Sequence, residues 1–173
     1  MKAYKDFLEL AENRYSVRKY SDRPIEDEKM DRILRAGQVA PTAVNRQPQR
    51  IFVLRSREAL EKAQKVTRFT FGAPVIILVC SDKNVCHTMN DGQYLGPVDC
   101  SIALTQMMLE AFEEGIGSCW VRGFDRNDVK KVFELPDNLV PEAMMPMGYP
   151  ADDSEPSKFH SENISIDEMV KYL

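Results

Sequence analysis

The sequence of 173 residues is poor in the side chains that build metal centres and catalytic triads. It contains two histidines and four cysteines, and no two cysteines form a Cys-x-x-Cys pair. A structural zinc site needs four such ligands, so the adjacent pair Cys86-His87 would require distant partners. A Ser-His-Asp or Cys-His array is thinly supplied as well. We predict no metal site, no catalytic side chain, and free buried thiols in a chain long enough not to need disulfides.

Long apolar runs and an excess of positive charge are also missing. The longest apolar run is Val75–Cys80, which is far too short to cross a bilayer. Charged residues such as Lys5 and Asp6 interrupt the start of the chain, so we expect no secretory signal and a cytoplasmic protein. The formal net charge is −4, whereas binding to a nucleic-acid backbone needs a basic surface. Neither a membrane nor a nucleic acid is an expected partner.

What is present is the composition of an ordinary globular protein, 43% hydrophobic and 29% charged. We predict a single domain over residues 1–173, because the chain shows no repeat and no linker. Helices are predicted at Ala3–Glu12, from Pro24 to Gly37, at Arg57–Lys65, from Pro97 to Phe112 and at Arg126–Glu134. Strands are predicted at Ile51–Leu54, Val75–Cys80 (buried on both faces), Ser118–Gly123 and Glu142–Gly148. Their irregular alternation favours the α+β or α/β class.

The first candidate for ligand binding is a short alternating segment near the N-terminus. Arg14, Ser16 and Arg18 fall on one side of this segment if it is extended. Two guanidiniums and a hydroxyl on one side can bind a phosphate through charge-assisted hydrogen bonds. A solvated basic stretch that pairs with neighbours such as Glu12 explains the same residues, since surface arginines are common. The segment alone leaves both interpretations open.

The second candidate is the loop Pro41–Pro48. It places Thr42, Asn45 and Gln47 between two prolines, and amide side chains offer both donors and acceptors. The edges of an isoalloxazine ring offer the same groups. A polar connection between a helix and a strand is, however, a common feature with no binding role.

Two later segments complete the set. Glycines in Gly115–Gly123 can bring backbone amides close to a flat ligand, although Trp120 is equally well explained as a core residue. Lys158 and His160 are two potential cations in a polar stretch, where isolated residues are usually solvated. Each segment has a simple structural explanation, so the order and spacing of the four segments carry the inference.

This ordered set resembles the nitroreductase family of FMN-dependent oxidoreductases over almost the whole chain. R-x-S-x-R at 14–18 comes first, and A-P-[ST]-x-x-N-x-Q-P at 40–48 follows one helix later. A buried strand and a long helix then lead into G-[LI]-G-x-x-W at 115–120, and Met147–Pro150 ends the last strand. Each motif is short, but the ordered set is hard to obtain by chance.

The resemblance implies an α+β fold, a three-layer α/β/α sandwich on a mainly antiparallel sheet, in an intertwined homodimer with FMN at the interface. It implies that Arg14 and Ser16 bind the phosphate, that Arg18 lies near the pyrimidine edge of the ring, and that Pro41–Asn45 comes from the partner subunit. The backbone N–H of Arg122 or Gly123 would approach flavin N5. The residues assigned to the cofactor in this way are Arg14, Tyr15, Ser16, Arg18, Pro41, Thr42, Ala43, Asn45, Gln47, Trp120, Arg122, Gly123, Lys158 and His160.

The implied activity is a ping-pong transfer of electrons from NADH or NADPH to nitroaromatics, quinones or related small acceptors, with the flavin supplying the hydride chemistry. His160 stands where the family usually has an arginine, and histidine titrates near neutrality.

Two alternatives remain. One keeps the fold with another reaction, reductive dehalogenation or flavin fragmentation; the other is a flavin-binding module without turnover. No clamp for a 2′-phosphate is identifiable, and residues 84–97 are compact where larger members insert helices.

Overall fold

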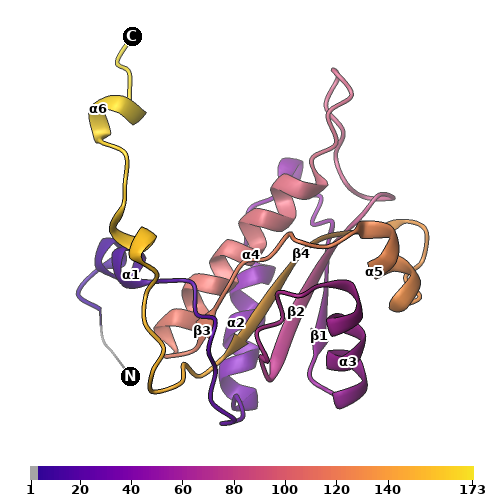
Figure 1. The fold of residues 1–173 in the computed structure, drawn as a ribbon. Coiled ribbons are helices and arrows are strands. Elements are labelled where there is room, and N and C mark those ends of the chain that lie inside the picture. Colours follow the sequence, from indigo (N-terminus) through magenta and orange to yellow (C-terminus); the bar gives the residue numbers. More distant parts are fainter. Residues whose placement is uncertain (1–3) are drawn as a thin grey trace.

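A single antiparallel sheet lies at the centre of the computed structural model, which describes residues 4–173 (Figure 1). Its strands are β1 (Gln49–Leu54), β2 (Val75–Asp82), β3 (Gly117–Ser118) and β4 (Leu139–Gly148), in the spatial order β1-β2-β4-β3. The helices are α1 (Phe7–Asn13), α2 (Asp27–Gln38), α3 (Arg57–Val66), α4 (Gly96–Glu113), α5 (Arg126–Val132) and α6 (Ile166–Met169), with short 3-10 helices η1 (Ala43–Asn45) and η2 (Lys158–Ser161).

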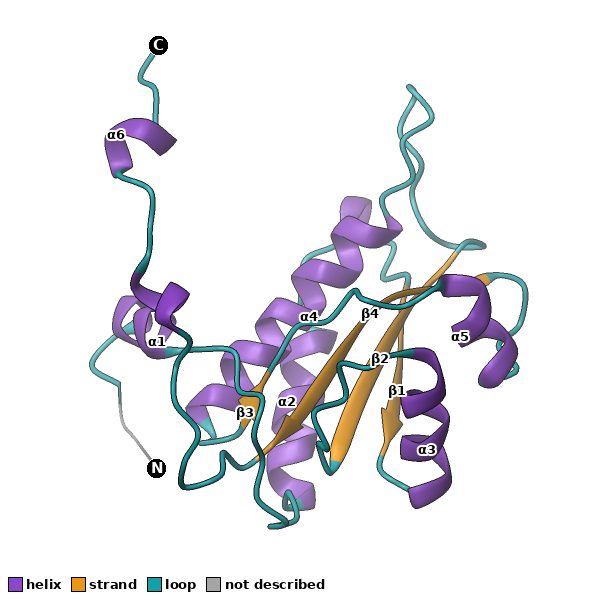
Figure 2. Ribbon diagram, in the orientation of Figure 1, coloured by secondary structure: helices purple, strands orange, loops and turns teal. Residues whose placement is uncertain are grey.

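Helices cover both faces of this sheet (Figure 2). Val75, Ile77 and Val79 of β2 pack in one core cluster with residues of α2 and α4. Ile76 and Leu78, which alternate with them, pack in a second cluster with residues of α3 and α5. Every residue of β2 is buried, as predicted for a strand that is covered on both sides. The predicted three-layer α/β/α arrangement on an antiparallel sheet is therefore confirmed.

The long helix α4 is the central element of one outer layer. It begins at Gly96 with Pro97 in its first turn, where a missing N–H costs no hydrogen bond. Seven of its 18 residues are buried, which fixes it firmly against the sheet and α2. At 1.5 Å per residue the helix spans about 27 Å. Two candidate site segments lie at its opposite ends.

The predicted strand Ser118–Gly123 is wrong in its extent. The strand β3 ends at Ser118, and the chain returns to β4 only at an isolated bridge between Val121 and Met144. Between these points Cys119 N–H donates to the carbonyl oxygen of Pro146 at 3.1 Å. Pro146 has no N–H to return the bond, so the ladder is interrupted there.

Smaller differences concern the first helix and the thiols. Helix α1 begins at Phe7, because the Asp6 side chain caps it by accepting the Glu9 N–H at 3.0 Å; Ala3 of the predicted helix lies outside the described residues. The four cysteines are free, as predicted, although Cys86 is only half-buried. Burial raises the pKa of the Cys80 thiol to about 12. Within residues 4–173, none of the helices has the length and apolarity needed to cross a bilayer.

Candidate functional site

The Arg14–Tyr20 segment runs across the C-terminal end of α4 and along β3. Val17 N–H donates to the Ser118 carbonyl oxygen at 2.9 Å, and Ser16 pairs with Ser118 in a parallel bridge. The Val17 side chain is fully buried, and a Cβ added to Gly117 would lie 2.4 Å from Val17 Cγ2. The segment can therefore approach β3 this closely only because residue 117 is glycine. Arg18, next to the buried Val17, is exposed.

A polar cavity of about 450 Å³ lies at the Arg14 end of the segment. Arg14, His160, Ser161 and Asn163 line it, together with Glu12. These side chains come from the end of α1 and from η2 and the residues that follow it, so they are distant in sequence. A guanidinium with hydroxyl and amide groups around one cavity is a donor set that suits an anion.

A second cavity of about 400 Å³ lies at the Arg18 end. It is lined by Arg18, Phe69, Phe71 and the backbone and side chains of residues 119–123. Trp120 lines this cavity with 38% of its surface exposed, so it is not a core residue. Aromatic walls and nearby glycines suit a flat ligand better than a compact one.

Glu12 lines the Arg14 cavity, but neither arginine of the segment is paired with an acid among the described residues. Among the ion pairs of the described residues, none involves Arg14 or Arg18. The solvated-pair interpretation, in which Glu12 or its neighbours balance these charges, therefore has no support in the structure. Four residue steps of fully extended chain span at most about 13 Å, which is the limit for the separation of the two arginine backbones. The segment can hold a ligand whose anionic end and flat end lie that far apart.

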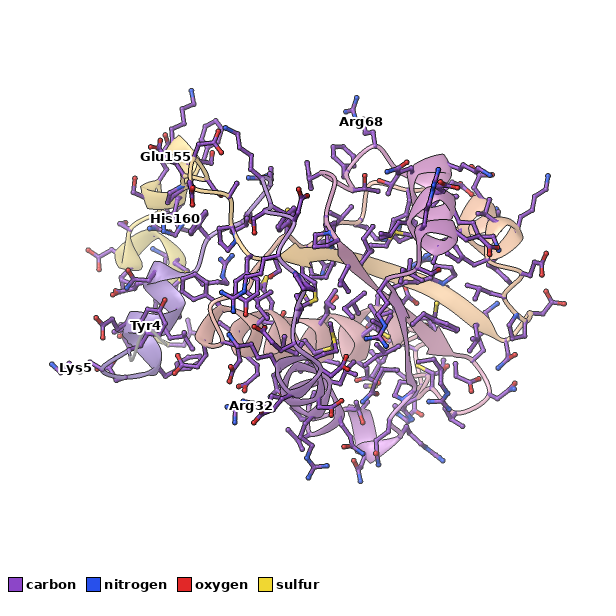
Figure 3. The ribbon with its side chains drawn as sticks, turned by 90° about the horizontal axis from the view of Figure 1, so that it is seen from below. Tyr4, Lys5, Arg32, Arg68, Glu155 and His160 are labelled. Carbon is purple, nitrogen blue, oxygen red and sulfur yellow. The ribbon has the colours of Figure 1, made fainter. Side chains whose placement is uncertain are left out.

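Phe69 and Phe71 were missed by the sequence reasoning. The Thr67 hydroxyl donates to the Gly123 carbonyl oxygen at 2.8 Å and accepts the Phe69 N–H at 3.2 Å, which joins this turn to the 119–123 segment. The two rings lie 6.1 Å apart, and a Cβ on Gly123 would lie 2.3 Å from Phe69. Arg68, between Thr67 and Phe69, projects outward (Figure 3). The available signal was two aromatics just before the Gly72-Ala73-Pro74 turn.

The backbone of the 119–123 segment has unused donors. In the part of the chain that the structure describes, the N–H groups of Arg122 and Gly123 donate to no backbone carbonyl. The Arg122 guanidinium donates to the Phe124 carbonyl oxygen at 3.2 Å, and burial and the nearby Arg126 lower its pKa. The side chain of Arg122 is thus held by Phe124, while its backbone borders the cavity.

The two predicted cations of the C-terminal segment behave differently. The His160 ring lies 6.3 Å from the Tyr15 ring in an edge-to-face arrangement and lines the Arg14 cavity. Figure 3 shows it at the same end of the molecule as Tyr4. Lys158 is exposed over the ring of its neighbour Phe159, at 4.9 Å, and does not line that cavity. The structure therefore brings His160, and not Lys158, to Arg14.

The Pro41–Gln47 loop lies at the other end of α4, as Figure 1 shows. Ala43 N–H donates to Asp99 Oδ1 in the first turn of α4 at 2.9 Å. The arginine segment, in contrast, contacts Gly117 and Ser118 beyond the last turn of α4. The loop residues Pro41, Thr42, Ala43, Asn45 and Gln47 are thus separated from the arginine segment of the same chain by most of α4, a helix about 27 Å long.

Comparison with known proteins identifies the family. The family model described as the nitroreductase family matches residues 11–71 and 65–149, which together cover most of the chain. This chain belongs to the nitroreductase family. The predicted membership is confirmed, and the match includes the Arg14–Arg18 segment, the Pro41–Pro48 loop and the Gly115–Gly123 segment.

Other proteins are similar to this chain in sequence or in structure. A crystal structure of a nitroreductase family protein from Clostridium difficile 630 is 40% identical, covers 96% of this chain and 98% of its own, and has a TM-score of 0.91. A relative from Methanothermobacter thermautotrophicus, provisionally named NADH dehydrogenase/NAD(P)H nitroreductase, is 34% identical over 170 residues and covers 91% of this chain and 87% of its own. The Bacillus subtilis protein named FMN reductase [NAD(P)H] is 27% identical over 161 residues, covering 80% of this chain and 64% of its own.

Proposed function

We propose that this nitroreductase family chain is an FMN-dependent oxidoreductase that passes electrons from NADH or NADPH to nitroaromatic, quinone or related small acceptors. The observation that carries the proposal is the pair of cavities at the two ends of the Arg14–Arg18 segment. Arg14 lines one cavity, and Arg18 and Arg122 line the other; none of the three forms an ion pair within the described residues. A guanidinium that has no acidic partner and lines a cavity can bind an anionic group strongly.

The residues present fit FMN in the order of its parts. Arg14, with Ser161 and His160 around the same cavity, would hold the phosphate. The cavity lined by Phe69 and Trp120 would hold the ring, up to about 13 Å further along the segment. A phosphate, a five-carbon ribityl chain and a tricyclic ring can bridge such a span. The donors are therefore distributed as the cofactor requires.

When bound, FMN supplies the hydride chemistry, and the protein binds, orients and tunes it. The Arg18 guanidinium beside the ring cavity would stabilise negative charge on the ring edge. The unused N–H groups of Arg122 and Gly123 would donate to ring nitrogen. Phe69 and Phe71 would exclude water from one side of the cavity. No side-chain nucleophile is needed for this role.

The site is completed in our proposal by a second copy of the chain. The Pro41–Gln47 loop lies too far from the arginines of its own chain to meet the same ligand. Large apolar side chains are exposed on α1 and α4, among them Phe7, Leu8 and Val98, and residues 164–173 extend away from the body of the molecule (Figure 1). Apolar surface of this kind marks an interface. A homodimer would cover it and bring each loop to the arginines of its partner.

The native protein is therefore expected to be yellow, to contain one FMN per chain and to bleach anaerobically with NADH or NADPH. The double variant Arg14→Ala/Arg18→Ala should lose the flavin spectrum, whereas Arg57→Ala on α3, whose side chain is 93% exposed, should keep it. A colourless wild-type protein that gains no thermal stability from added FMN would refute the proposal.

Two outcomes would favour the alternatives. A flavin that is reduced by neither nucleotide with any acceptor would indicate a binding module without turnover. A reduced flavin that yields dehalogenated or fragmented products would indicate a different reaction on the same fold. Product analysis after reduction with each nucleotide separates these cases from the proposed activity.

A further inference from the structure

The Pro41–Gln47 loop has a backbone conformation that its residues do not favour. Val44, Asn45 and Gln47 have φ values of 43°, 53° and 49°, in the left-handed region. Asparagine tolerates this region, but a β-branched residue such as Val44 is a clear outlier there. Val44 is also 71% exposed, so packing of its side chain does not impose the conformation. Other contacts must hold the loop in this form.

Hydrogen bonds inside the loop supply part of the restraint. The Thr42 hydroxyl accepts the Gln47 N–H at 3.0 Å, and the Thr42 carbonyl accepts the Asn45 N–H at 3.0 Å. These bonds close the turn on itself. They do not fix the turn to the rest of the molecule.

Asp99 makes the connection to the body of the protein. Its Oδ1 accepts the Ala43 N–H at 2.9 Å, while the residue is 1% exposed. Its Oδ2 is buried, with no hydrogen-bond partner among the described residues. A buried carboxylate with a spare oxygen is costly, which argues that the charge serves a purpose.

The position of Asp99 suits a rigid anchor. It lies in the first turn of α4, where the positive end of the helix dipole favours a carboxylate. The helix itself is fixed by its seven buried residues. A hydrogen bond to a charged acceptor is stronger than one between neutral groups. The loop is thereby tied to the most firmly packed helix in its layer.

We propose that Asp99 is a positioning residue for the flavin site of the partner subunit. It holds the Pro41–Gln47 loop in the strained form that this site takes, without touching the flavin itself. The inference rests on the proposed function, because it assumes that the loop completes an FMN site across the dimer. It adds a residue outside the predicted site set and gives the strained backbone a role.

The first test measures FMN affinity by quenching of flavin fluorescence in apo-protein. In Asp99→Ala the loop is no longer tied down, so the fraction of chains in the binding form falls and the apparent Kd rises by the same factor. We expect FMN to bind at least tenfold more weakly to Asp99→Ala and to Asp99→Leu, which has the same branching and number of heavy atoms but no acceptor. Asp99→Asn keeps an acceptor for Ala43 N–H and should bind within threefold of wild type. Asp128→Ala, in the first turn of α5, is the matched control and should leave the Kd unchanged.

The second test asks which subunit is affected. A heterodimer is purified with two different tags; one chain carries Asp99→Ala and the other carries Arg14→Ala/Arg18→Ala. Its second chain presents an intact loop to the intact arginines of the first. We expect one site of wild-type affinity per heterodimer and none in either homodimer. A residue that acted only within its own chain would leave the heterodimer without a tight site.

The outcomes separate the inference from the proposed function. A wild-type protein that binds no FMN overturns both. Wild-type affinity in Asp99→Ala and Asp99→Leu, or no tight site in the heterodimer, overturns the role of Asp99 and leaves the flavin site standing. Weakened binding in Asp99→Asn equal to that in Asp99→Leu would also overturn it, because the retained acceptor would then be irrelevant.

Discussion

Replacing Gly117 by alanine tests whether close packing at β3 positions the arginines. The added Cβ would lie 2.4 Å from Val17 Cγ2 and 2.7 Å from Val17 Cβ. A rotamer change moves Cγ2 but not Cβ, so the clash is relieved only if the backbone of Val17 moves. That backbone is held by the bond from Val17 N–H to the Ser118 carbonyl and lies between Arg14 and Arg18. The substitution should therefore displace the whole segment.

Two magnitudes follow from this contact. Overpacking of a filled core lowers the free energy of unfolding by about 1–3 kcal/mol. Replacing glycine by alanine also lowers the entropy of the unfolded chain, which offsets about 0.4–1 kcal/mol of this loss. For a domain of this size, a net loss of about 1–2 kcal/mol lowers Tm by roughly 2–8 °C. Loss of one hydrogen bond to a charged group costs about 1.5–3 kcal/mol, so FMN should bind at least about tenfold more weakly.

The assay compares thermal unfolding of the apo-protein and FMN titration at one fixed protein concentration. Gly92→Ala is the control, because Gly92 has φ +88° and no atom within 4 Å of an added Cβ. Its left-handed strain of about 1–2 kcal/mol should lower Tm by a similar amount but leave the FMN Kd unchanged. An unchanged Kd in Gly117→Ala would refute the idea that Val17 packing sets the arginines, and an unchanged Tm would refute the clash itself.

Two further predictions concern charges away from the site. Arg126→Met removes the partner of the buried Glu142 carboxylate and should destabilise the protein by about 2–4 kcal/mol in urea unfolding, whereas Arg57→Met on the exposed face of α3 should change it by less than about 0.5 kcal/mol. The Tyr149 hydroxyl, which donates to Glu26 at 2.5 Å, is the main cause that lowers the pKa of Glu26 from 4.5 to about 2. The ionised Glu26 carboxylate stabilises the fold above pH 4.5, and this stabilisation is lost as the pH falls toward 2. Glu26→Gln should therefore lose less stability than the wild type between pH 4.5 and 2. Equal slopes of stability against pH in the two proteins would contradict this.

Local patterns along the chain were sufficient to predict most helices and strands and to indicate the family. The apolar spacing of α2, α3 and α4 predicted these helices to within about two residues at most ends, and the continuous apolar run at Val75–Cys80 predicted a strand covered on both faces. Helical and extended periodicities depend on residues a few positions apart, so one chain carries them in full. The order of the four short motifs then indicated the nitroreductase family, which the comparisons confirmed.

The sequence alone did not determine features that depend on a distant partner. The strand predicted at Ser118–Gly123 is interrupted because Pro146, on another strand, has no N–H to offer. Lys158 and His160 were both assigned to the cofactor, and packing against Tyr15 brings His160 to the Arg14 cavity while Lys158 is exposed. In both cases the deciding contact joins residues more than twenty positions apart.

The candidate site also combines features that the sequence predicts with contacts that only the tertiary structure reveals. Charge and alternation made Arg14, Ser16 and Arg18 candidates for phosphate binding, and only the resemblance to the nitroreductase family gave them a role at a flavin. Only the tertiary structure placed Phe69 against Gly123 and joined Ala43 to Asp99, 56 residues away. Such contacts depend on how α4 and the sheet pack together, and no periodicity in the sequence encodes a distance between two loops.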